Sequence, residues 1–187
     1  MYNISKIKTD LKNNLSEYRY EHCIMVANEA KKLAIHYNVD PEKAYLAGLV
    51  HDIAKEYSDE ENLIWIQKYH LPETLLEKDL RPVIHADIGA VVIKELYNLD
   101  DEICNAVRYH ALGNYPMTLF EKIIYVADKI ARKTDDELLK KEQKLAYENI
   151  DLVLKMCIEF SQKKLALSGK TLQPVTQKLL NSLEEIK

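Results

Sequence analysis

The chain has 187 residues, which is enough for one domain with a full hydrophobic core. Hydrophobic residues make up 47% and charged residues 30% of it, with only 4 glycines and 5 prolines, a composition typical of a helical protein and not of a sheet-rich or disordered one. The formal net charge of -4 provides no positive field that would hold a nucleic-acid duplex, so we expect no nucleic-acid partner.

The cysteines and the N-terminus exclude further classes of protein. Cys23, Cys104 and Cys157 are odd in number, far apart in the chain and never in a C-x-x-C arrangement, so neither a disulfide framework nor a zinc knuckle is expected. The opening stretch MYNISKIKTDLKNN lacks the apolar core of a signal peptide, and no segment approaches the roughly 18 apolar residues of a membrane span. We therefore expect a soluble protein of the reducing cytoplasm that makes no membrane contact.

Helical periodicity begins close to the start of the chain. It predicts a helix over residues 2–14 and a stronger one over 16–37, where the apolar side chains form one face. Asp40 then provides an N-cap and Pro41 the first position of a third helix. We expect this third helix to continue through the stretch AYLAGLVHDIAKEY at residues 44–57.

Caps and breaks mark the remaining elements. Helices are predicted over 58–70, 83–99, 100–112 and 118–133, then one long charged helix over 135–166 and, after a turn at 168–174, a last helix that ends at Ile186. No alternating strand pattern persists, so the predicted fold class is all-α. The chain is expected to form a single domain over residues 1–187, with a core at about 16–134 on which the helices of 135–187 pack.

The stretch at residues 44–57 contains an unexpected pair of titratable groups. Leu46, Leu49 and Ile53 form the apolar stripe of an amphipathic helix. His51 and Asp52 stand among them as neighbours. Because burying a carboxylate without a partner is costly, Asp52 requires a positive partner from elsewhere in the chain.

Three further histidines and a second aspartate have the same character. His22, His85 and His110 each fall within an amphipathic helix, near its apolar face or its end, and Asp128 lies in the apolar run IIYVADKIA. A single histidine on an apolar face is more often satisfied by its neighbours in the core. Histidines and carboxylates gathered from separate helices are, however, a recurring way to bind divalent transition metals. The whole set therefore favours a metal site in the core.

The order of these residues resembles a known signature. His22, then His51-Asp52, then Asp128 is similar to the H…HD…D pattern of the HD-domain superfamily of metal-dependent phosphohydrolases. The segments RYEHCIMVA, YLAGLVHDIAKE, HADIGAVVIKE, NAVRYHALG and LFEKIIYVADKI resemble, in order and spacing, its YqeK-type members. These are the symmetrical bis(5'-nucleosyl)-tetraphosphatases of bacteria, which hydrolyse diadenosine tetraphosphate.

The resemblance implies a fold and a metal centre. The fold would be an HD-domain helical bundle with the metal in its core, whose C-terminal helices at 135–187 close a nucleotide pocket. The family uses iron, and one or two divalent or mixed-valence ions are expected. The metal ligands by position are His22, His51, Asp52 and Asp128. Asp52 would bridge two ions, and His85 and His110 would complete a second metal position or contact phosphate oxygens.

The resemblance also implies contacts to the substrate. Arg19 in RYEH and Lys55 in HDIAK would neutralise phosphate charge. The catalytic set by position is Asp52, Lys55, His85 and His110. The segment QPVT resembles one that lines the nucleotide pocket of the family, and the candidates there are Gln173, Pro174 and Thr176, with Asn181 further on. Plainer explanations exist as well, a solvated helix surface for Lys55 and a helix start after a turn for Pro174.

Two segments depart from the family pattern. Where the family usually has H-T-T-G, this chain has HALG at residues 110–113, and it loses two hydroxyls close to the expected phosphates. Where the family usually continues with E-P-N-R after the metal aspartate, this chain has ARKT at residues 131–134. Arg132 or Lys133 would then replace the family arginine. The departures leave the metal ligands in place and concern the substrate.

The implied function is hydrolysis of a nucleotide phosphoanhydride by a metal-activated water, with symmetrical cleavage of diadenosine tetraphosphate into two ADP as the leading hypothesis. Because the expected ligands act on phosphate and not on the leaving group, two alternatives stay open. One is another HD nucleotide phosphatase, such as a nucleoside 5'-monophosphate phosphohydrolase. The other is a catalytically weakened module that binds metal and nucleotide. The oligomeric state is also open, a homodimer through the helix at 135–166 being one arrangement.

Overall fold

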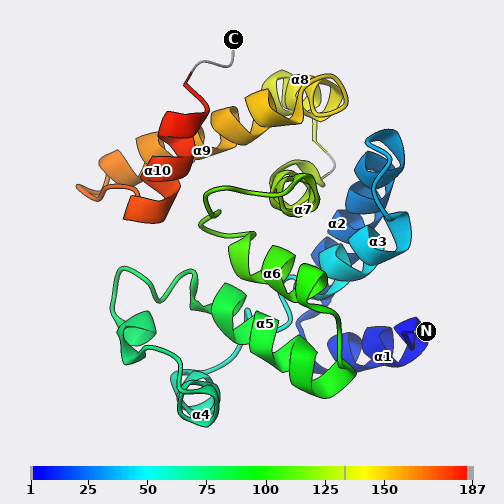
Figure 1. The fold of residues 1–187 in the computed structure, drawn as a ribbon, viewed down its shortest axis with the longest axis vertical. Helices are drawn as coiled ribbons and strands as arrows, with labels where there is room; N and C mark the ends of the chain where they lie inside the picture. Colours follow the sequence, from blue (N-terminus) through cyan, green and yellow to red (C-terminus); the bar gives the residue numbers. More distant parts are fainter. Residues whose placement is uncertain (1, 133, 185–187) are drawn as a thin grey trace.

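The computed structural model describes residues 2–132 and 134–184, and every regular element in this part of the chain is a helix, so the all-α class is confirmed there. Figure 1 shows α6 and α7 near the centre, with α2 and α3 on one side and α9 and α10 on the other. Within the described residues, no helix has the length and hydropathy needed to span a bilayer. The elements are α1 (Ile4–Asn14), α2 (Glu17–His36), α3 (Pro41–Val50), α4 (Asp59–Tyr69), η1 (Glu73–Leu76), α5 (Ile84–Tyr97), α6 (Asp101–Tyr109), α7 (Leu119–Ile130), α8 (Glu137–Leu145), α9 (Ile150–Ala166) and α10 (Pro174–Ser182).

Side-chain caps begin several helices where the sequence predicts them. Asp40 accepts hydrogen bonds from two backbone N–H groups at the start of α3, and Pro41 occupies its first position. Ser58 and Glu61 form a capping box at the start of α4. The helices predicted over 2–14, 16–37, 58–70, 83–99, 100–112 and 118–133 are confirmed to within a few residues at their ends. The predicted last residue of the final helix, Ile186, lies outside the described residues.

The third helix is shorter than the sequence indicates. It ends at Val50, so the prediction that it continues through residues 44–57 is wrong. In the turns that follow, backbone N–H groups bond three residues back, as from Lys55 to the Asp52 carbonyl at 2.9 Å. Nδ1 of His51 lies 2.7 Å from the Gly48 carbonyl, the acceptor that a continued helix would have used. His51 and Asp52 therefore stand at the end of the helix and not inside its stripe.

The prediction of one long charged helix over 135–166 is also wrong, because the helix is interrupted at residues 146–149, between α8 and α9. The side chain of Asn149 accepts a hydrogen bond from a first-turn N–H of α9 and caps it. The hydroxyl of Tyr37 in α2 donates to the Ala146 carbonyl at 2.7 Å and ties the break to the core. The single long helix expected to form the contact of a homodimer is therefore absent from the described residues.

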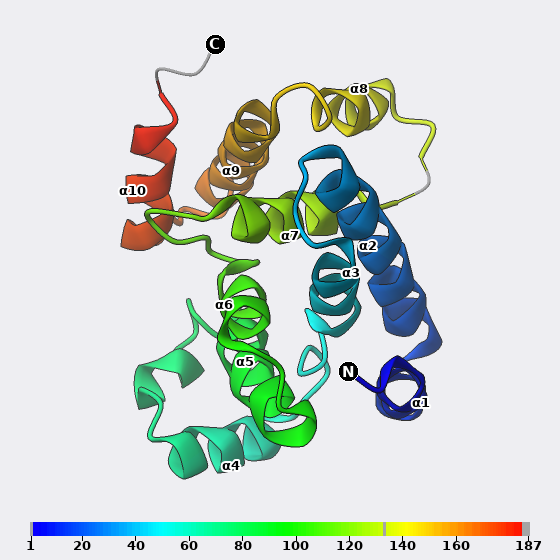
Figure 2. The ribbon, with the colours of Figure 1, turned by 45° about the vertical axis from the view of Figure 1, so that its right-hand side comes forward.

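Helices α2 and α3 approach each other so closely that a glycine is required between them. They lie side by side in both views (Figures 1 and 2). A Cβ atom at Gly48 of α3 would lie 2.8 Å from the Cα of Ala27 in α2, which is far inside contact distance. Val26, Ala27 and Ala30 on the facing side of α2 are fully buried. This contact holds the start of α2, with His22, close to the end of α3, with His51.

The C-terminal helices pack on this bundle. α9 contacts α7, and α10 contacts α9 (Figure 2). The hydroxyl of Thr176 in α10 donates to the Leu112 carbonyl at 2.7 Å. Gly113, at a φ of +75°, is covered by Leu179 of α10 so closely that a Cβ would lie 2.5 Å from a methyl carbon. These contacts attach α10 to the segment after α6, whereas the organisation of residues 1–187 as one domain stays a prediction.

Replacing Gly48 by alanine tests the contact between α2 and α3. The added Cβ would meet backbone atoms, which cannot move aside cheaply, so we expect the free energy of unfolding to fall by about 1–3 kcal/mol or more. Urea denaturation followed by circular dichroism measures the change.

Gly89→Ala in α5 is the matched control for Gly48→Ala. Its added Cβ would lie 3.4 Å from the nearest atom, a Val107 methyl, which is ordinary contact. Stability should then be unchanged or slightly higher, because alanine favours the helix over glycine. Equal losses in the two variants would contradict the close contact at Gly48.

Candidate metal centre and active site

The histidines and aspartates that the sequence singles out come from separate elements and converge in the core. They are His22 in α2, His51 and Asp52 directly after α3, His85 in the first turn of α5, His110 at the end of α6 and Asp128 in α7. The side chains of His22 and Asp128 are 17% and 14% exposed, whereas the other four residues are buried. The cluster therefore has a buried side and a side that opens to solvent.

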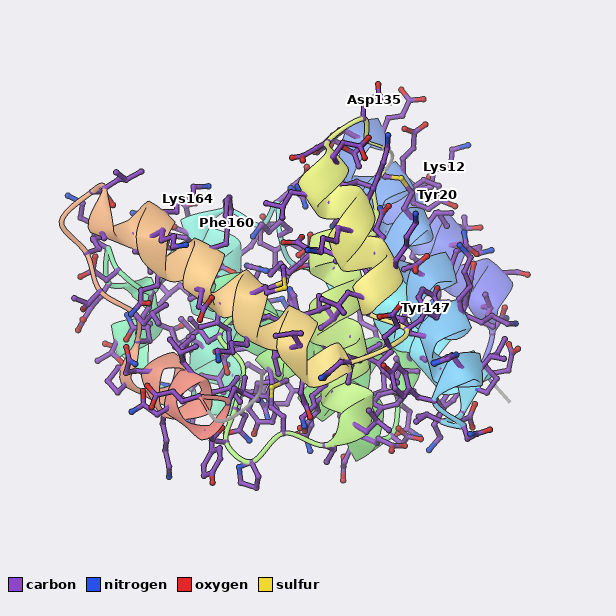
Figure 3. All side chains as sticks on the ribbon, turned by 90° about the horizontal axis from the view of Figure 1, so that it is seen from above. Lys12, Tyr20, Asp135, Tyr147, Phe160 and Lys164 are labelled. Atoms are coloured by element: carbon purple, nitrogen blue, oxygen red, sulfur yellow. The ribbon has the colours of Figure 1, made fainter. Side chains whose placement is uncertain are left out.

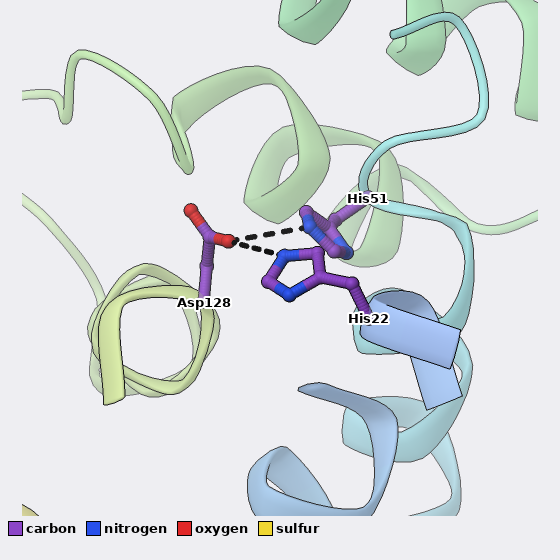
Figure 4. A group of neighbouring side chains, drawn as sticks. All are labelled: His22, His51 and Asp128. Carbon is purple, nitrogen blue, oxygen red and sulfur yellow. Dashed lines mark hydrogen bonds and ion pairs between the residues drawn. The ribbon is translucent and has the colours of Figure 1, made fainter. Parts of the chain in front are cut away.

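The open side of the cluster is the outer group, which consists of His22, His51 and Asp128. Oδ1 of Asp128 lies 3.0 Å from Nε2 of His22 and 3.4 Å from Nε2 of His51 (Figure 4). One ligand atom from each residue lies within 4.8 Å of the others. Such spacing suits nitrogen and oxygen ligands that surround one cation at about 2.0–2.2 Å.

The buried side is the inner group, which consists of His51, Asp52 and His110, with ligand atoms that also lie within 4.8 Å of one another. Oδ1 of Asp52 lies 3.6 Å from Nε2 of His110 and 3.2 Å from Nε2 of His85. Oδ2 of Asp52 lies 3.3 Å from Nε2 of His51. Oδ2 of Asp52 thus lies beside His51, which belongs to both groups, and Oδ1 lies beside His85 and His110. A carboxylate with ligands on both oxygens can bridge two cations. The bridging role itself stays a prediction.

Backbone carbonyls decide which nitrogen of two histidines faces the cluster. Nδ1 of His51 lies 2.7 Å from the Gly48 carbonyl, and Nδ1 of His110 lies 2.6 Å from the Val107 carbonyl. A carbonyl can only accept, so Nδ1 donates, and in a neutral ring Nε2 keeps its lone pair. Nε2 of His51 is buried and makes no hydrogen bond to any described residue. A nitrogen left in this way between two carboxylates fits a divalent transition metal.

Both aspartates are held in the ionised form. Burial raises the pKa of Asp52, but the charge of His51 and the hydrogen bonds from His110, His51 and His85 together outweigh burial and lower the pKa below the usual range of a carboxyl group. Burial likewise opposes ionisation of Asp128, but Lys129 and the neighbouring histidines lower its pKa well below the usual value. The cluster thus presents two carboxylates near neutral pH.

The buried imidazoles are of two kinds. Burial lowers the pKa of His85 to about 4 and also lowers the pKa of His110, so both rings are neutral at pH 7. Burial opposes a charge on His51 as well, but Asp52 and Asp128 outweigh it and raise the pKa of His51. A proton and a cation therefore compete for Nε2 of His51, as they do at metal ligands in general.

A cleft of about 1280 Å³ opens from the outer group toward the C-terminal helices. His22 and Asp128 line it, together with residues of α7, α8, α9 and α10, of the connection between α9 and α10, and of the segments at 79–83 and 111–112. The lining includes five of the substrate candidates from the sequence, namely Arg19, Arg132, Gln173, Pro174 and Thr176. Their role as substrate contacts stays a prediction.

The other residues that the sequence singles out near the substrate do not all line the cleft. Ala111 and Leu112, which stand where the family pattern has two hydroxyls, line it. Thr176 is only 4% exposed, and its hydroxyl is used by the Leu112 carbonyl, so its contacts favour a part in holding α10. Asn181 is not among the described residues that line the cleft. Lys133 lies outside the described residues.

Two basic side chains contact the Oδ2 atoms of the aspartates. Nη1 of Arg19 lies 2.7 Å from Oδ2 of Asp52, and Nζ of Lys129 lies 2.6 Å from Oδ2 of Asp128. The sequence places Arg19 near the site but gives no role to Lys129. The ammonium of Lys129 also lies 5.3 Å from the ring centre of Tyr125, one turn earlier in α7. Its only signal in the sequence is its position beside Asp128.

Lys55 lies on the buried side of the cluster and is not among the described residues that line the cleft. Its Nζ is 3.2 Å from Nδ1 of His85 and 3.4 Å from the Pro82 carbonyl. Burial lowers the pKa of Lys55. His85 belongs to neither group of ligand atoms, although its Nε2 lies 3.2 Å from Nε2 of His110. Its part in a second metal position or in a phosphate contact stays a prediction.

The fold and the site together define a helical protein with a candidate metal centre in its core and a cleft beside it. The HD domain family matches residues 19–133 of the chain. That range covers more than half of the chain and includes all the clustered histidines and aspartates. The chain therefore belongs to the HD domain family.

Similar proteins confirm the resemblance to the symmetrical bis(5'-nucleosyl)-tetraphosphatases. The chain is 41% identical over 122 residues to the "Bis(5'-nucleosyl)-tetraphosphatase, symmetrical" of Bacillus subtilis (strain 168), a stretch that covers 64% of each protein. It is 38% identical over 130 residues to the protein of the same name from Staphylococcus aureus (strain NCTC 8325 / PS 47), covering 68% of this chain and 66% of that one. The matched stretch thus spans slightly less than two thirds of the length of these relatives.

A solved structure extends the likeness to the C-terminal helices. The crystal structure of a predicted HD superfamily hydrolase involved in NAD metabolism from Clostridium acetobutylicum matches with a TM-score of 0.90 and 33% sequence identity. The match covers 100% of both chains. The arrangement of α8, α9 and α10 on the bundle therefore also has a counterpart in an HD hydrolase.

Removing a ligand of the outer group tests the metal centre. We expect His22→Ala to lower metal affinity by more than the roughly 10–100-fold that loss of a supporting contact costs. Metal analysis of protein purified without oxygen measures the effect. His36→Ala, an exposed histidine at the end of the same helix, is the matched control and should keep its metal. Full metal content in His22→Ala would contradict the assignment of the outer group.

The buried imidazole of His85 makes stability depend on pH. Its pKa is about 4 in the folded protein against an ordinary value of 6.5, so the unfolded chain takes up the proton first. Its contribution to the free energy of unfolding is fully present above pH 6.5 and is lost progressively between about pH 6.5 and pH 4. Urea midpoints of the metal-free protein should fall over this window, and His85→Gln should reduce the slope. An unchanged slope in that variant would contradict a buried neutral His85.

Proposed function

We propose that the protein is a metal-dependent hydrolase that cleaves diadenosine tetraphosphate symmetrically into two ADP. The observation that carries the proposal is a cluster of ionised aspartates and imidazoles that opens into a cleft of about 1280 Å³. Pockets for small ligands usually measure about 300–1,000 Å³, so this cleft favours a substrate larger than a mononucleotide. The names of the Bacillus subtilis and Staphylococcus aureus relatives support the same substrate.

The proposed cofactor is a transition metal, one or two ions of iron in the divalent or mixed-valence state. His22, His51 and Asp128 would hold one ion, and Asp52 with His110 would hold a second. Imidazole and carboxylate together suit iron, and the resemblance to a family that uses iron supports this choice. When bound, the metal supplies a water of lowered pKa, so that no serine or cysteine nucleophile is needed.

The side chains around the cluster would manage the charge of the phosphates. Hydrolysis adds one water across the central P–O–P bond, and both products leave as ADP. Arg19 and Lys129 stand where the outer group meets the cleft and would neutralise charge on non-bridging oxygens. On the buried side, Lys55 holds His85 beside Asp52, and we propose that His85 and His110 also act on phosphate oxygens.

Two alternative functions are consistent with the same cluster. A nucleoside 5'-monophosphate phosphohydrolase would use the same clustered residues, because they act on phosphate. A module that binds metal and nucleotide without turnover would be consistent with Ala111 and Leu112, which bring no hydroxyl to the cleft. The Clostridium acetobutylicum relative is described as involved in NAD metabolism, so NAD belongs in a substrate panel.

The proposed setting is the reducing cytoplasm, with a small nucleotide as the partner. Three buried cysteines without a disulfide support it. The proposed chemistry needs no second copy of the chain, because all the clustered residues come from one chain. A homodimer therefore stays a separate prediction.

Product analysis tests the proposed function. Metal-loaded protein, purified without oxygen, is incubated with diadenosine tetraphosphate, AMP and NAD, and the products are identified by chromatography. We expect ADP as the only nucleotide product from diadenosine tetraphosphate. Inorganic phosphate released from AMP would support the monophosphatase instead, and binding without any product would support the inactive module.

The variant Asp52→Asn tests whether the clustered residues carry that activity. It should lower kcat by at least on the order of 10²-fold, because one oxygen of the cluster loses its charge. Asp87→Asn in α5 is the matched control, since that carboxylate lies outside the cluster, 3.5 Å from Arg108. If Asp52→Asn kept full metal content and full hydrolysis, the proposed metal centre would be wrong.

A further inference from the structure

An exposed phenylalanine stands on the wall of the cleft. Phe160 in α9 lines the cleft and is 66% exposed, whereas Phe120 is only 3% exposed. Figure 3 shows Phe160 and Lys164 on the same side of α9, the side that faces the gap toward α8. Leu138 of α8 also lines the cleft and is 56% exposed. Apolar side chains on two helices are thus left uncovered inside a cleft and not on an open surface.

Phe160 and the candidate metal centre share one cleft. Cys157 lies three residues earlier in α9, about 4.5 Å along the helix axis, and lines the same cleft. Phe160, one turn further along α9, lines the same cleft as His22 and Asp128 of the outer group. A ligand in this cleft therefore has the aromatic ring and the candidate metal centre on walls of the same cavity.

Basic side chains accompany the phenylalanine. Lys164 follows Phe160 by four residues, so the two side chains are neighbours on the helix surface. Arg132, after α7, lines the same cleft. Neither Lys164 nor Arg132 forms an ion pair with another described residue, in contrast to Lys170, which pairs with Asp79 at 2.9 Å. The cleft thus combines an aromatic face with two cations that remain available to a phosphate chain.

We propose that Phe160 stacks on a purine base of the substrate, with Leu138 as the apolar contact from α8 and Lys164 beside the attached phosphates. The proposal rests on the function proposed above, because it takes a nucleotide as the ligand of the cleft. An aromatic side chain offers a face on which any base can stack, and such stacking contributes to affinity without base-specific hydrogen bonds. Phe160 would therefore determine how tightly a nucleoside is held and leave the chemistry at the metal unchanged.

Steady-state kinetics test this role. Phe160→Ala should raise KM for diadenosine tetraphosphate about tenfold, the usual effect of losing one base stack, while kcat stays the same. Phe160→Trp should keep a KM close to that of the unchanged protein. Inhibition by inorganic triphosphate, which has no base, should be the same in all of these proteins. Ile64→Ala in α4, 61% exposed and outside the cleft lining, is the matched control.

A binding measurement separates this proposal from the proposed function. In the metal-loaded Phe160→Trp variant, ADP should quench the tryptophan emission in a saturable way and inorganic phosphate should not. Leu96→Trp, at an exposed position of α5 outside the cleft lining, should not respond to ADP.

Each outcome of these measurements decides a different question. Quenching by ADP without any turnover of diadenosine tetraphosphate keeps the base subsite and overturns the proposed substrate. Normal turnover with an unchanged KM in Phe160→Ala overturns the base subsite and keeps the proposed substrate. Absence of ADP binding, measured by calorimetry, together with absence of turnover of diadenosine tetraphosphate, overturns both.

Discussion

Two carboxylates inside a helical core constrain this structure more than any other feature. Neither Asp52 nor Asp128 can stay ionised away from water without positive or hydrogen-bonding partners. Arg19 contacts one oxygen of Asp52 and Lys129 one oxygen of Asp128, while histidines from several elements lie beside both carboxylates. Displacing any one of these helices would leave a buried charge without compensation. The packing of the bundle and the electrostatics of its centre therefore support each other.

The cluster forms where helices stop, and this explains its geometry. His51 and His110 directly follow the last residues of α3 and α6, and each ring donates through Nδ1 to a carbonyl three residues earlier. Carbonyls in the last turn of a helix have no backbone partner within it. The same hydrogen bond therefore completes the helix terminus and turns Nε2 toward the aspartates. One hydrogen bond at each site thus both terminates the helix and orients the candidate metal ligand.

The histidine and aspartate cluster could be predicted from the sequence. Charged groups within apolar helix faces require partners, and the H…HD…D pattern of the family shows which residues those partners are. Lys129 could not, since a lysine after a helical aspartate looks like solvated charge until the fold places its ammonium against Asp128 at the edge of the cleft. The break at residues 146–149 depends on a hydrogen bond from Tyr37, 109 residues earlier, and no local pattern contains that information. The exposure of Phe160 likewise depends on the direction in which α8 and α9 diverge (Figure 3). The apolar periodicity of the two helices does not predict that direction.

The hydrogen bond from Thr176 to the Leu112 carbonyl has a consequence for biosynthesis. Chains fold from the N-terminal side as they leave the ribosome. The clustered residues, which end at Asp128, are all synthesised before α9 and α10. The growing chain can therefore gather its aspartates and histidines while the side that becomes the cleft still faces water. A metal ion would then meet an accessible cluster, and the cleft would be completed only when α10 docks beside the segment that follows His110.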